Sequence, residues 1–515
     1  MVAHDEEAHA LLDEFELANE SVKAGDNSAS SSAFLESQPR SKTHRVKRPC
    51  RMGFIATLIV VTLLFAIKVI VSLTSDEFPG PTIETRSGDR LEVHVHNGLQ
   101  EDGVSLHWHG LRMKDQNLMD GAVGLTQCPV PAGTSFIYNF TIGDDERGTF
   151  WWHSHSDVQR ADGLWGGLIV HSLEETSPPQ EDYLIMVGDW FHRNQTEVLA
   201  WYADASSRGN EPVPDSLLLN GRGRFNCSMA VPARPVVCTQ VATNDLSPLF
   251  KSSDSKTTRL RVVNTGSISG FTMKIDEATM QPLRVDGGFD VMSGTTESVG
   301  ILYPGERVDL DVKWKRNFLG SRRLTISMDD ENFGYPNPAL NPIQTFPVFD
   351  DDVDGSDLEQ AQQDLKPSAT QILDSQNLKA ATRISEIPAK AEQTFVLYAK
   401  TEKLAHMDYE PVGFINHTSW KPQSPPLLAQ NRSSWDANQM IPFIKMSPGK
   451  PTRVDIIINN LDDGAHPFHL HGHSFYVLSS YKEEGRGGWG SYNPYSGRDS
   501  PNGLDLDFPL RKDTC

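Results

Sequence analysis

The stretch Arg90-Leu-Glu-Val-His-Val-His96 alternates apolar and polar side chains with a period of two. This alternation is typical of a β-strand that is buried on one face only. Two further stretches, which begin at Thr258 and at Val454, repeat the pattern. Short segments rich in proline and glycine punctuate the chain between them. Short strands with regular turns predict an all-β protein built from β-sandwiches.

Length and composition limit the classes of function. The chain has 515 residues, enough for about three domains of typical size. Its formal net charge of −21 repels the phosphate backbone, so a nucleic-acid partner is excluded. The five cysteines are too few for a disulfide scaffold, and their spacing does not fit a zinc site.

The apolar stretch 53–73 is about 20 residues long, the length that spans a bilayer as a helix. Lys68 is its only charge. Basic residues precede the stretch and acidic residues follow it, which places the N-terminus in the cytosol. Because the leader is longer than that of a cleaved signal peptide, we expect an uncleaved transmembrane signal anchor at 53–73. The remainder of the chain would then be lumenal or extracellular.

Glycosylation motifs and composition complete the domain prediction. Five Asn-x-Ser/Thr motifs all lie after the apolar stretch, at Asn139, Asn194, Asn226, Asn416 and Asn431. Residues 1–52 are acidic, then serine-rich, then basic, which is typical of a disordered cytosolic tail. We expect β-sandwich domains at 77–175, 176–348 and 389–515, with an acidic linker at 349–388 between the second and the third.

Three histidine-rich runs carry the chemistry. They are His107-Trp-His109, His153-Ser-His155 and His466-Pro-Phe-His469-Leu-His471-Gly-His473. In a strand, residues i and i+2 point to the same face, so each His-x-His pair aims two imidazoles in one direction. The 17 histidines form five such pairs, whereas random placement predicts roughly half of one pair. Clustered histidines usually indicate a metal site.

The number of histidines distinguishes between metals. One zinc ion takes about four ligands, and the histidines predicted to converge exceed that number. Several copper ions fit an imidazole-rich set better. Two positions are set aside: His94 and His96 are interpreted as surface residues, and His473 is interpreted as a structural residue beside the site because Gly472 interrupts the strand.

Several of these segments resemble known motifs. Phe78-Pro-Gly-Pro-Thr-Ile, Leu106-His-Trp-His-Gly-Leu, Gly148-Thr-Phe-Trp-Trp-His-Ser-His, Pro304-Gly-Glu-Arg and His466-Pro-Phe-His-Leu-His-Gly-His look like the motifs of multicopper oxidases, in particular fungal laccases and their ferroxidase relatives. The resemblance implies three cupredoxin-like Greek-key β-sandwich domains, with a trinuclear copper cluster between the first and the third.

The resemblance also implies roles for individual residues. His107 and His469 would hold a type-2 copper, and His466 would be a ligand of the type-1 copper that receives electrons from the substrate. The binuclear type-3 pair would be held by four histidines: His109, His153, His155 and His471. The carboxylate of Asp120 would lie beside the cluster and help to deliver protons, which the reduction of O₂ to water consumes. A turn residue before Gly121 is the alternative interpretation of Asp120.

The family carries a further His-Cys-His motif that completes the type-1 site, and this chain ends at Cys515 before that motif. The third domain is therefore expected to be incomplete, with an open sheet edge. We expect that this polypeptide alone does not make a working oxidase. Two alternatives stay open: an oxidase whose full-length form has the missing motif, and a truncated, non-catalytic copper-binding membrane protein.

The electron donor is predicted only weakly. Iron-oxidising relatives have a glutamate where this chain has Ala161, and the loop 265–270 lacks the acid that binds phenols in many laccases. Phenolic or other aromatic donors are favoured by default, with Fe²⁺ as the alternative. Oxidative coupling in pigment or secondary-metabolite synthesis is a role that the resemblance allows. Of the lumenal cysteines, Cys227 and Cys238 close the shortest loop, although four cysteines allow three pairings.

Overall fold

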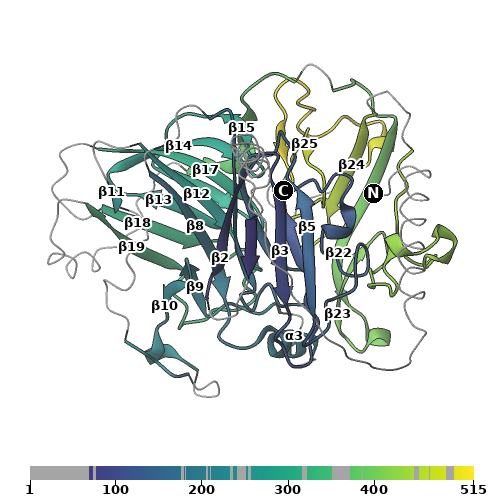
Figure 1. The fold of residues 1–515 in the computed structure, drawn as a ribbon, viewed down its shortest axis with the longest axis horizontal. Coiled ribbons are helices and arrows are strands. Elements are labelled where there is room, and N and C mark those ends of the chain that lie inside the picture. Colours follow the sequence, from purple (N-terminus) through teal and green to yellow (C-terminus); the bar gives the residue numbers. More distant parts are fainter. Residues whose placement is uncertain are drawn as a thin grey trace, which may run out of the picture.

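A computed structural model describes residues 69–72 and 77–515, apart from 176–178, 180, 205–206, 209, 232–235, 241–250, 253–256, 316–321, 351–371, 385–386, 446–451, 463 and 483–491. The described chain is mostly β-strand, as predicted from the sequence. It forms three strand-rich regions, with the second domain at the left of Figure 1, the first at the centre and the third at the right.

The first domain packs two sheets around one apolar core. One sheet has the order β1 (Val69–Ser72), β3 (Arg90–His96) and β5 (Ser135–Thr141); the other has the order β2 (Gly80–Arg86), β7 (Trp165–His171), β6 (Gly148–Ser154) and β4 (Leu106–His109). Along β3 the apolar side chains are buried and His94 and His96 are exposed. The period-two pattern and the surface position of these two histidines are therefore confirmed.

Strand β1 lies at the end of the apolar stretch. Residues 69–72 pair in parallel with β3, from Val69 opposite Leu91 to Ser72 opposite His94, so these four positions form a strand, whereas the helix of the stretch is predicted to continue to Leu73. The edge of β3 offers unpaired backbone groups, and the β-branched run Val69-Ile-Val71 suits a strand. The tail 1–52 and residues 53–68 lie outside the described residues. Among the residues that are described, no helix combines the length and the apolar character needed to cross a membrane.

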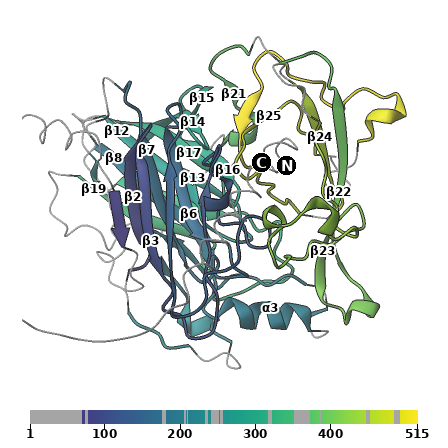
Figure 2. The same cartoon turned by 45° about the vertical axis from the view of Figure 1, so that its right-hand side comes forward.

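The second domain packs a large sheet on a smaller one (Figure 2). The large sheet has the order β10 (Arg222–Arg224), β9 (Ser216–Leu219), β8 (Glu181–Trp190), β12 (Thr258–Asn264), β17 (Arg307–Trp314), β14 (Ala278–Val285), β15 (Phe289–Met292) and β21 (Lys379–Ala380). The smaller sheet has the order β11 (Lys251–Ser252), β19 (Ile343–Asp350), β18 (Arg322–Met328), β13 (Phe271–Ile275), β16 (Ser298–Leu302) and β20 (Ile372–Asp374). A disulfide joins Cys227 and Cys238, which confirms the favoured pairing.

One helix and the predicted linker complete this domain. Helix α3 (Gln195–Ala203) begins after Asn194, whose side chain accepts a hydrogen bond from the Thr196 amide. Strands β20 and β21 lie within the predicted linker 349–388, but they pair with β16 and β15 of the second domain. Residues 372–380 of the predicted linker therefore add short strands to the sheets of the second domain, because exposed sheet edges favour pairing with the passing chain. Residues 351–371 are outside the described part of the chain.

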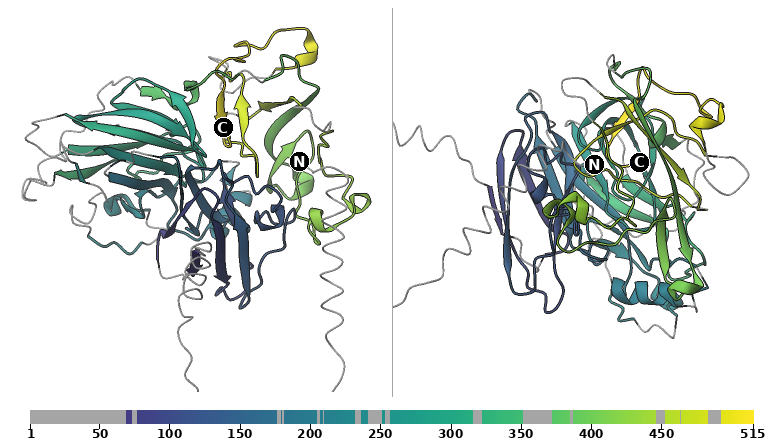
Figure 3. Two further views of the ribbon diagram at one scale, coloured as in Figure 1. Left: turned by 45° about the horizontal axis from the view of Figure 1, so that its top comes forward. Right: turned by 90° about the vertical axis from the view of Figure 1, so that its right-hand side faces the viewer.

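The third domain holds two smaller sheets. Strand β22 (Gln393–Lys403) lies between β23 (Pro411–Ile415) and β24 (Val454–Asn460), and β25 (Phe475–Val477) pairs with β26 (Leu510–Lys512). A cavity of about 1690 Å³ lies between these sheets and is lined by side chains that include Ile458, Val477 and His466. The last residues of the chain run between the second and third domains (Figure 3).

Candidate metal centre

Two neighbouring strands of the first domain carry the first histidines. Strands β4 and β6 are antiparallel, and their register places His107 directly opposite His153. Every residue of both strands is buried, because the tryptophans of the two motifs fill the surrounding core. His155 follows β6, and its amide donates to the carbonyl of Ser105. The two predicted pairs therefore meet on one face of one sheet.

The third histidine run reaches the same place from the third domain. His469 forms a β-bridge with Thr514, and its Nε2 lies 3.3 Å from Nε2 of His107. Its ring stacks on the His109 ring at a centroid distance of 3.7 Å. His471 lies over His107 at 3.9 Å and beside His155 at 4.9 Å. The structure thus brings together six of the seven histidines predicted to bind metal.

The hydrogen bonds of these rings determine which nitrogens are free. The Nδ1 atoms of His107, His153 and His469 bond the carbonyl oxygens of Asp120, Ser154 and Asp513 at 2.9, 2.8 and 2.8 Å. Since a carbonyl oxygen only accepts, each Nδ1 must carry the hydrogen, and each Nε2 keeps its lone pair. The Nε2 atoms of His107 and His469 face one another across the centre.

Burial favours the neutral form of five of the six rings. It lowers the pKa of His109, His153, His469 and His471 below the usual range, and lowers that of His155 to about 3. Neutral imidazoles whose lone pairs converge on one point are suitable ligands for a metal cation. The donor set therefore fits copper, which favours nitrogen ligands, and its size exceeds one zinc site.

Asp120 lies at the centre, as predicted. Its Oδ2 is 2.9 Å from Nδ1 of His471, and its Oδ1 is 3.2 Å from Nδ1 of His107. Burial raises the pKa of Asp120, but the two histidines outweigh burial and hold the pKa well below its usual range. Asp120 is only 4% exposed. It joins one ring from the first domain to one from the third.

His466 lies apart from the six. Its Nε2 is 3.1 Å from Oδ2 of Asp462, and its ring lines the cavity of the third domain together with Cys515. Burial raises the pKa of the Cys515 thiol to about 11. His473 is exposed, and its Nδ1 bonds the carbonyl of His471 at 3.3 Å.

Glu211 was missed by the sequence analysis. It lies between α3 and β9, burial raises its pKa, and the charge of His466 acts in the opposite direction, while Asp462 raises the pKa further. Glu211 is therefore electrostatically coupled to the predicted electron-entry histidine. No motif or spacing signals it, because the coupling links two segments from different domains.

Sequence comparison identifies the family. Profiles described as multicopper oxidase match residues 62–175, 181–324 and 415–515. Laccase-2 of Cryptococcus neoformans var. grubii is 31% identical over 466 residues, covering 86% of this chain and 74% of that protein. The chain belongs to the multicopper oxidases. The first profile begins at residue 62, ahead of the start predicted for the first domain at 77, in agreement with the place of β1.

Other relatives of this oxidase include iron-transport enzymes. The iron transport multicopper oxidase FET3 of Gibberella zeae is 30% identical over 447 residues, covering 85% of this chain and 65% of that protein. Among solved structures, that of Fet3p, a multicopper oxidase that functions in iron import, superposes with a TM-score of 0.73 at 23% identity, covering 87% of this chain and 83% of that one. A laccase from Botrytis aclada gives 0.65 at 23% identity, covering 87% and 80%. These structures establish the cupredoxin fold.

Proposed function

We propose that this oxidase reduces O₂ to water at the six-histidine centre, with electrons that enter at His466. The observation that carries the proposal is the convergence of imidazoles from the first and third domains with their lone pairs directed inward. On the family pattern, His107 and His469 would hold a type-2 copper, and His109, His153, His155 and His471 a type-3 pair. Bound copper would supply the one-electron redox chemistry.

The protein's own groups orient this centre and bring protons to it. Asp120 bonds His471 and His107 through different oxygens, so it fixes the relative position of two rings from different domains. It also places a carboxylate beside the centre, where the reduction of O₂ consumes protons. The buried tryptophans around β4 and β6 exclude bulk water from the rings.

A phenolic or other aromatic compound is the first proposed donor. Its support is the similarity to laccases and the carboxylate of Glu211, which is electrostatically coupled to His466 and is of the type that accepts the hydrogen of a phenolic hydroxyl. The loop 265–270 lacks such an acid, and Glu211 supplies one from a different segment. Oxidative coupling of aromatic metabolites is the corresponding role.

Ferrous iron is the second candidate donor, and a specific observation favours it. Asp462 contacts Nε2 of His466 at 3.1 Å, and Glu211 is coupled to both residues. Asp462 beside the electron-accepting imidazole, with the charge of Glu211 acting on the same group, suits Fe²⁺, which takes carboxylate ligands alongside imidazole. Asp462 and Glu211 offer carboxylates to iron even though this chain has Ala161 where iron-oxidising relatives have a glutamate.

The test is expression with copper, followed by O₂ uptake with dimethoxyphenol and with Fe²⁺ in parallel. Uptake driven by only one donor assigns the donor class. Copper bound without any O₂ uptake would support the non-catalytic alternative, since His466 belongs to neither of the possible metal-binding groups found among the described residues. Failure of the purified chain to bind copper would refute the proposal.

We further propose that the chain is anchored to a membrane by the apolar stretch, with its oxidase domains lumenal or extracellular. The support is the charge asymmetry and the position of the five glycosylation motifs. Carbonate extraction and glycosidase digestion test it: an unglycosylated protein that is released by carbonate would contradict the proposal.

A further inference from the structure

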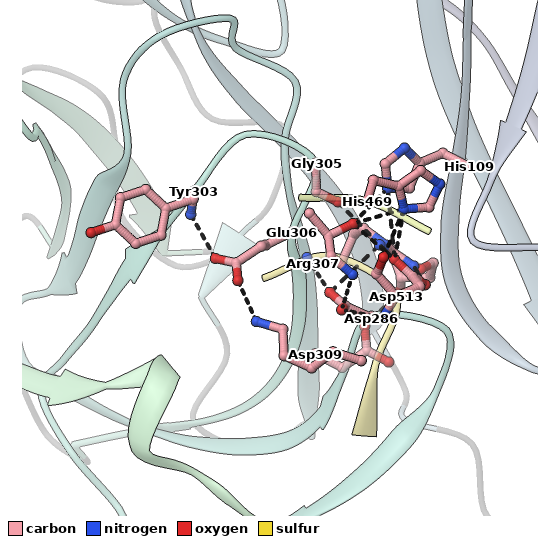
Figure 4. A network of polar contacts seen from close by, with 12 residues as sticks. His109, Asp286, Tyr303, Gly305, Glu306, Arg307, Asp309, His469 and Asp513 are labelled. Atoms are coloured by element: carbon pink, nitrogen blue, oxygen red, sulfur yellow. Dashed lines mark hydrogen bonds and ion pairs between the residues drawn. The ribbon is translucent and has the colours of Figure 1, made fainter. Parts of the chain in front are cut away.

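A buried arginine of the second domain connects the other two domains at the metal centre (Figure 4). The Nη1 and Nη2 atoms of Arg307 each donate to one carboxylate oxygen of Asp513 at 2.6 Å. Its Nε donates to the carbonyl of Thr149 at 3.1 Å, on the strand that carries His153. Both members of the ion pair are buried. Bidentate geometry of this kind fixes the orientation of the carboxylate.

The carboxylate in turn orients a hydroxyl. The Oγ1 of Thr514 donates to Oδ1 of Asp513 at 3.0 Å. A hydroxyl has one hydrogen, so the same oxygen can only accept from its other neighbours. One of these is Nε2 of His109, at 2.9 Å. His109 must therefore carry its hydrogen on Nε2, which leaves the lone pair on Nδ1.

This tautomer is the reverse of that of the neighbouring rings. His107, His153 and His469 carry the hydrogen on Nδ1, as their carbonyl partners require. In His109, Nδ1 is the atom directed to the centre, 3.4 Å from Nε2 of His153. With the other tautomer, His109 would direct an N–H at the centre and could not donate a lone pair there.

We propose that Arg307, Asp513 and Thr514 act as positioning residues that select the Nε2–H tautomer of His109 and hold the His469 ring. His469 contacts the same residues: its Nδ1 lies 3.1 Å from Thr514 Oγ1 and 2.8 Å from the Asp513 carbonyl oxygen. The proposal rests on the proposed function only for its consequence in copper binding; the tautomer is a property of the metal-free protein.

The backbone of this segment is held by a different residue. Oδ2 of Asp286 accepts from the amides of Asp513 and Thr514 at 3.0 and 3.3 Å, and Oδ1 accepts from the amide of Arg307 at 3.1 Å. Removing only the Thr514 hydroxyl therefore leaves the path of the chain intact. Replacing Asp513 would instead remove the bidentate partner of the buried Arg307 charge, which threatens folding.

The matched variants are Thr514→Val, which keeps the shape and loses the hydroxyl, and Thr514→Ser, which keeps the hydroxyl. The first readout is nitrogen NMR of the metal-free protein with labelled histidine, with His109 assigned by its loss in His109→Gln. We expect Nε2–H for His109 in the parent and in Thr514→Ser, and loss of that preference in Thr514→Val. An unchanged His109 tautomer in Thr514→Val would overturn the proposal.

The second readout is a Cu²⁺ titration followed by electron paramagnetic resonance. We expect Thr514→Val to bind copper at this centre about 10- to 100-fold more weakly, the usual effect of losing a partner of a ligand histidine, and Thr514→Ser to bind as the parent does. If the parent binds no copper but the His109 tautomer still changes in Thr514→Val, the proposed function is refuted and the positioning role of Arg307, Asp513 and Thr514 is supported. Equal copper affinity and equal spectra in Thr514→Val and the parent would contradict a role of the Thr514 hydroxyl in positioning the copper ligands.

Discussion

The Nε2 atoms of His107 and His469 lie 3.3 Å apart, although 362 positions separate the two residues in the chain. One comes from β4 of the first domain and the other from the segment after β24 of the third. Neither domain alone presents more than part of the six-histidine set. The interpretation of the sequence would have failed if these rings faced different ways, and they instead share one centre.

This shared centre predicts that His469→Gln removes copper binding selectively. We expect the type-2 electron paramagnetic resonance signal and O₂ uptake to fall by at least about 100-fold, because a ligand from one domain is lost. Bound copper per chain, measured by elemental analysis, should fall as well. His94→Gln is the control, since His94 is exposed on β3. Equal losses in both variants would indicate general unfolding and contradict the assignment.

Asp120 predicts a pH-dependent contribution to stability. Burial raises its pKa, but His107 and His471 outweigh burial and hold the pKa below that of the unfolded chain. A depressed carboxyl pKa contributes stability that is present above about pH 4 and is lost as the pH falls towards the folded pKa. Asp120→Asn should therefore reduce the free energy of unfolding of the metal-free protein more at pH 6 than at pH 3, measured in urea. The exposed Asp115 provides the control, Asp115→Asn; an equal effect of Asp120→Asn at both values would contradict the prediction.

The carboxylates of Glu211 and Asp462 predict different kinetic effects with Fe²⁺ and with a phenol as the electron donor. Glu211→Gln and Asp462→Asn should each raise the KM for Fe²⁺ about 10-fold if a cation binds there, because each removes one negative oxygen ligand. Turnover of a phenol should depend on Glu211 through hydrogen bonding, which the glutamine oxygen partly retains. Steady-state kinetics with both donors give the comparison. If neither Glu211→Gln nor Asp462→Asn changes the KM for Fe²⁺, these two carboxylates do not form an iron site.

The two free cysteines in the described part of the chain predict different reactivity. Burial raises the pKa of Cys515 to about 11, whereas Cys128 is exposed. Since the thiolate is the reactive form, Cys515 in the folded protein should be alkylated about two orders of magnitude more slowly than an ordinary thiol at pH 8. Peptide mapping after iodoacetamide treatment distinguishes the sites, and denaturant should abolish the difference. Rapid labelling of Cys515 in the folded protein would contradict its raised pKa.

The sequence predicted the parts of the site that depend on local spacing. His-x-His pairs on strands share a face whatever surrounds them, so the grouping of His107 with His109 and of His469 with His471 follows from their spacing alone. Asp120 was identified through a resembling motif, and its bonds to His107 and His471 explain its place. Glu211, Arg307 and Thr514 had no predicted role, because each acts across a domain boundary that a single sequence does not display.

Two differences between the sequence-based prediction and the structure have a common physical cause. Val69–Ser72 continues an apolar run that predicts a helix, and Ile372–Asp374 lies in polar surroundings that predict a linker. In the structure both segments pair with the edges of sheets formed elsewhere in the chain. Composition reports the local preference of a segment, whereas an open strand edge supplies hydrogen bonds that override it.

The pairing of β20 and β21 with the second domain has a mechanical consequence. The stretch 372–384 is anchored to the second domain along both of its sheets, and the amides of Ala380 and Ile384 bond the carbonyls of Phe508 and Asp507 near the chain's end. A protease nick between residues 351 and 371 would therefore sever the covalent chain without releasing either half. The nicked oxidase should still elute from a sizing column as one particle and come apart only in denaturant.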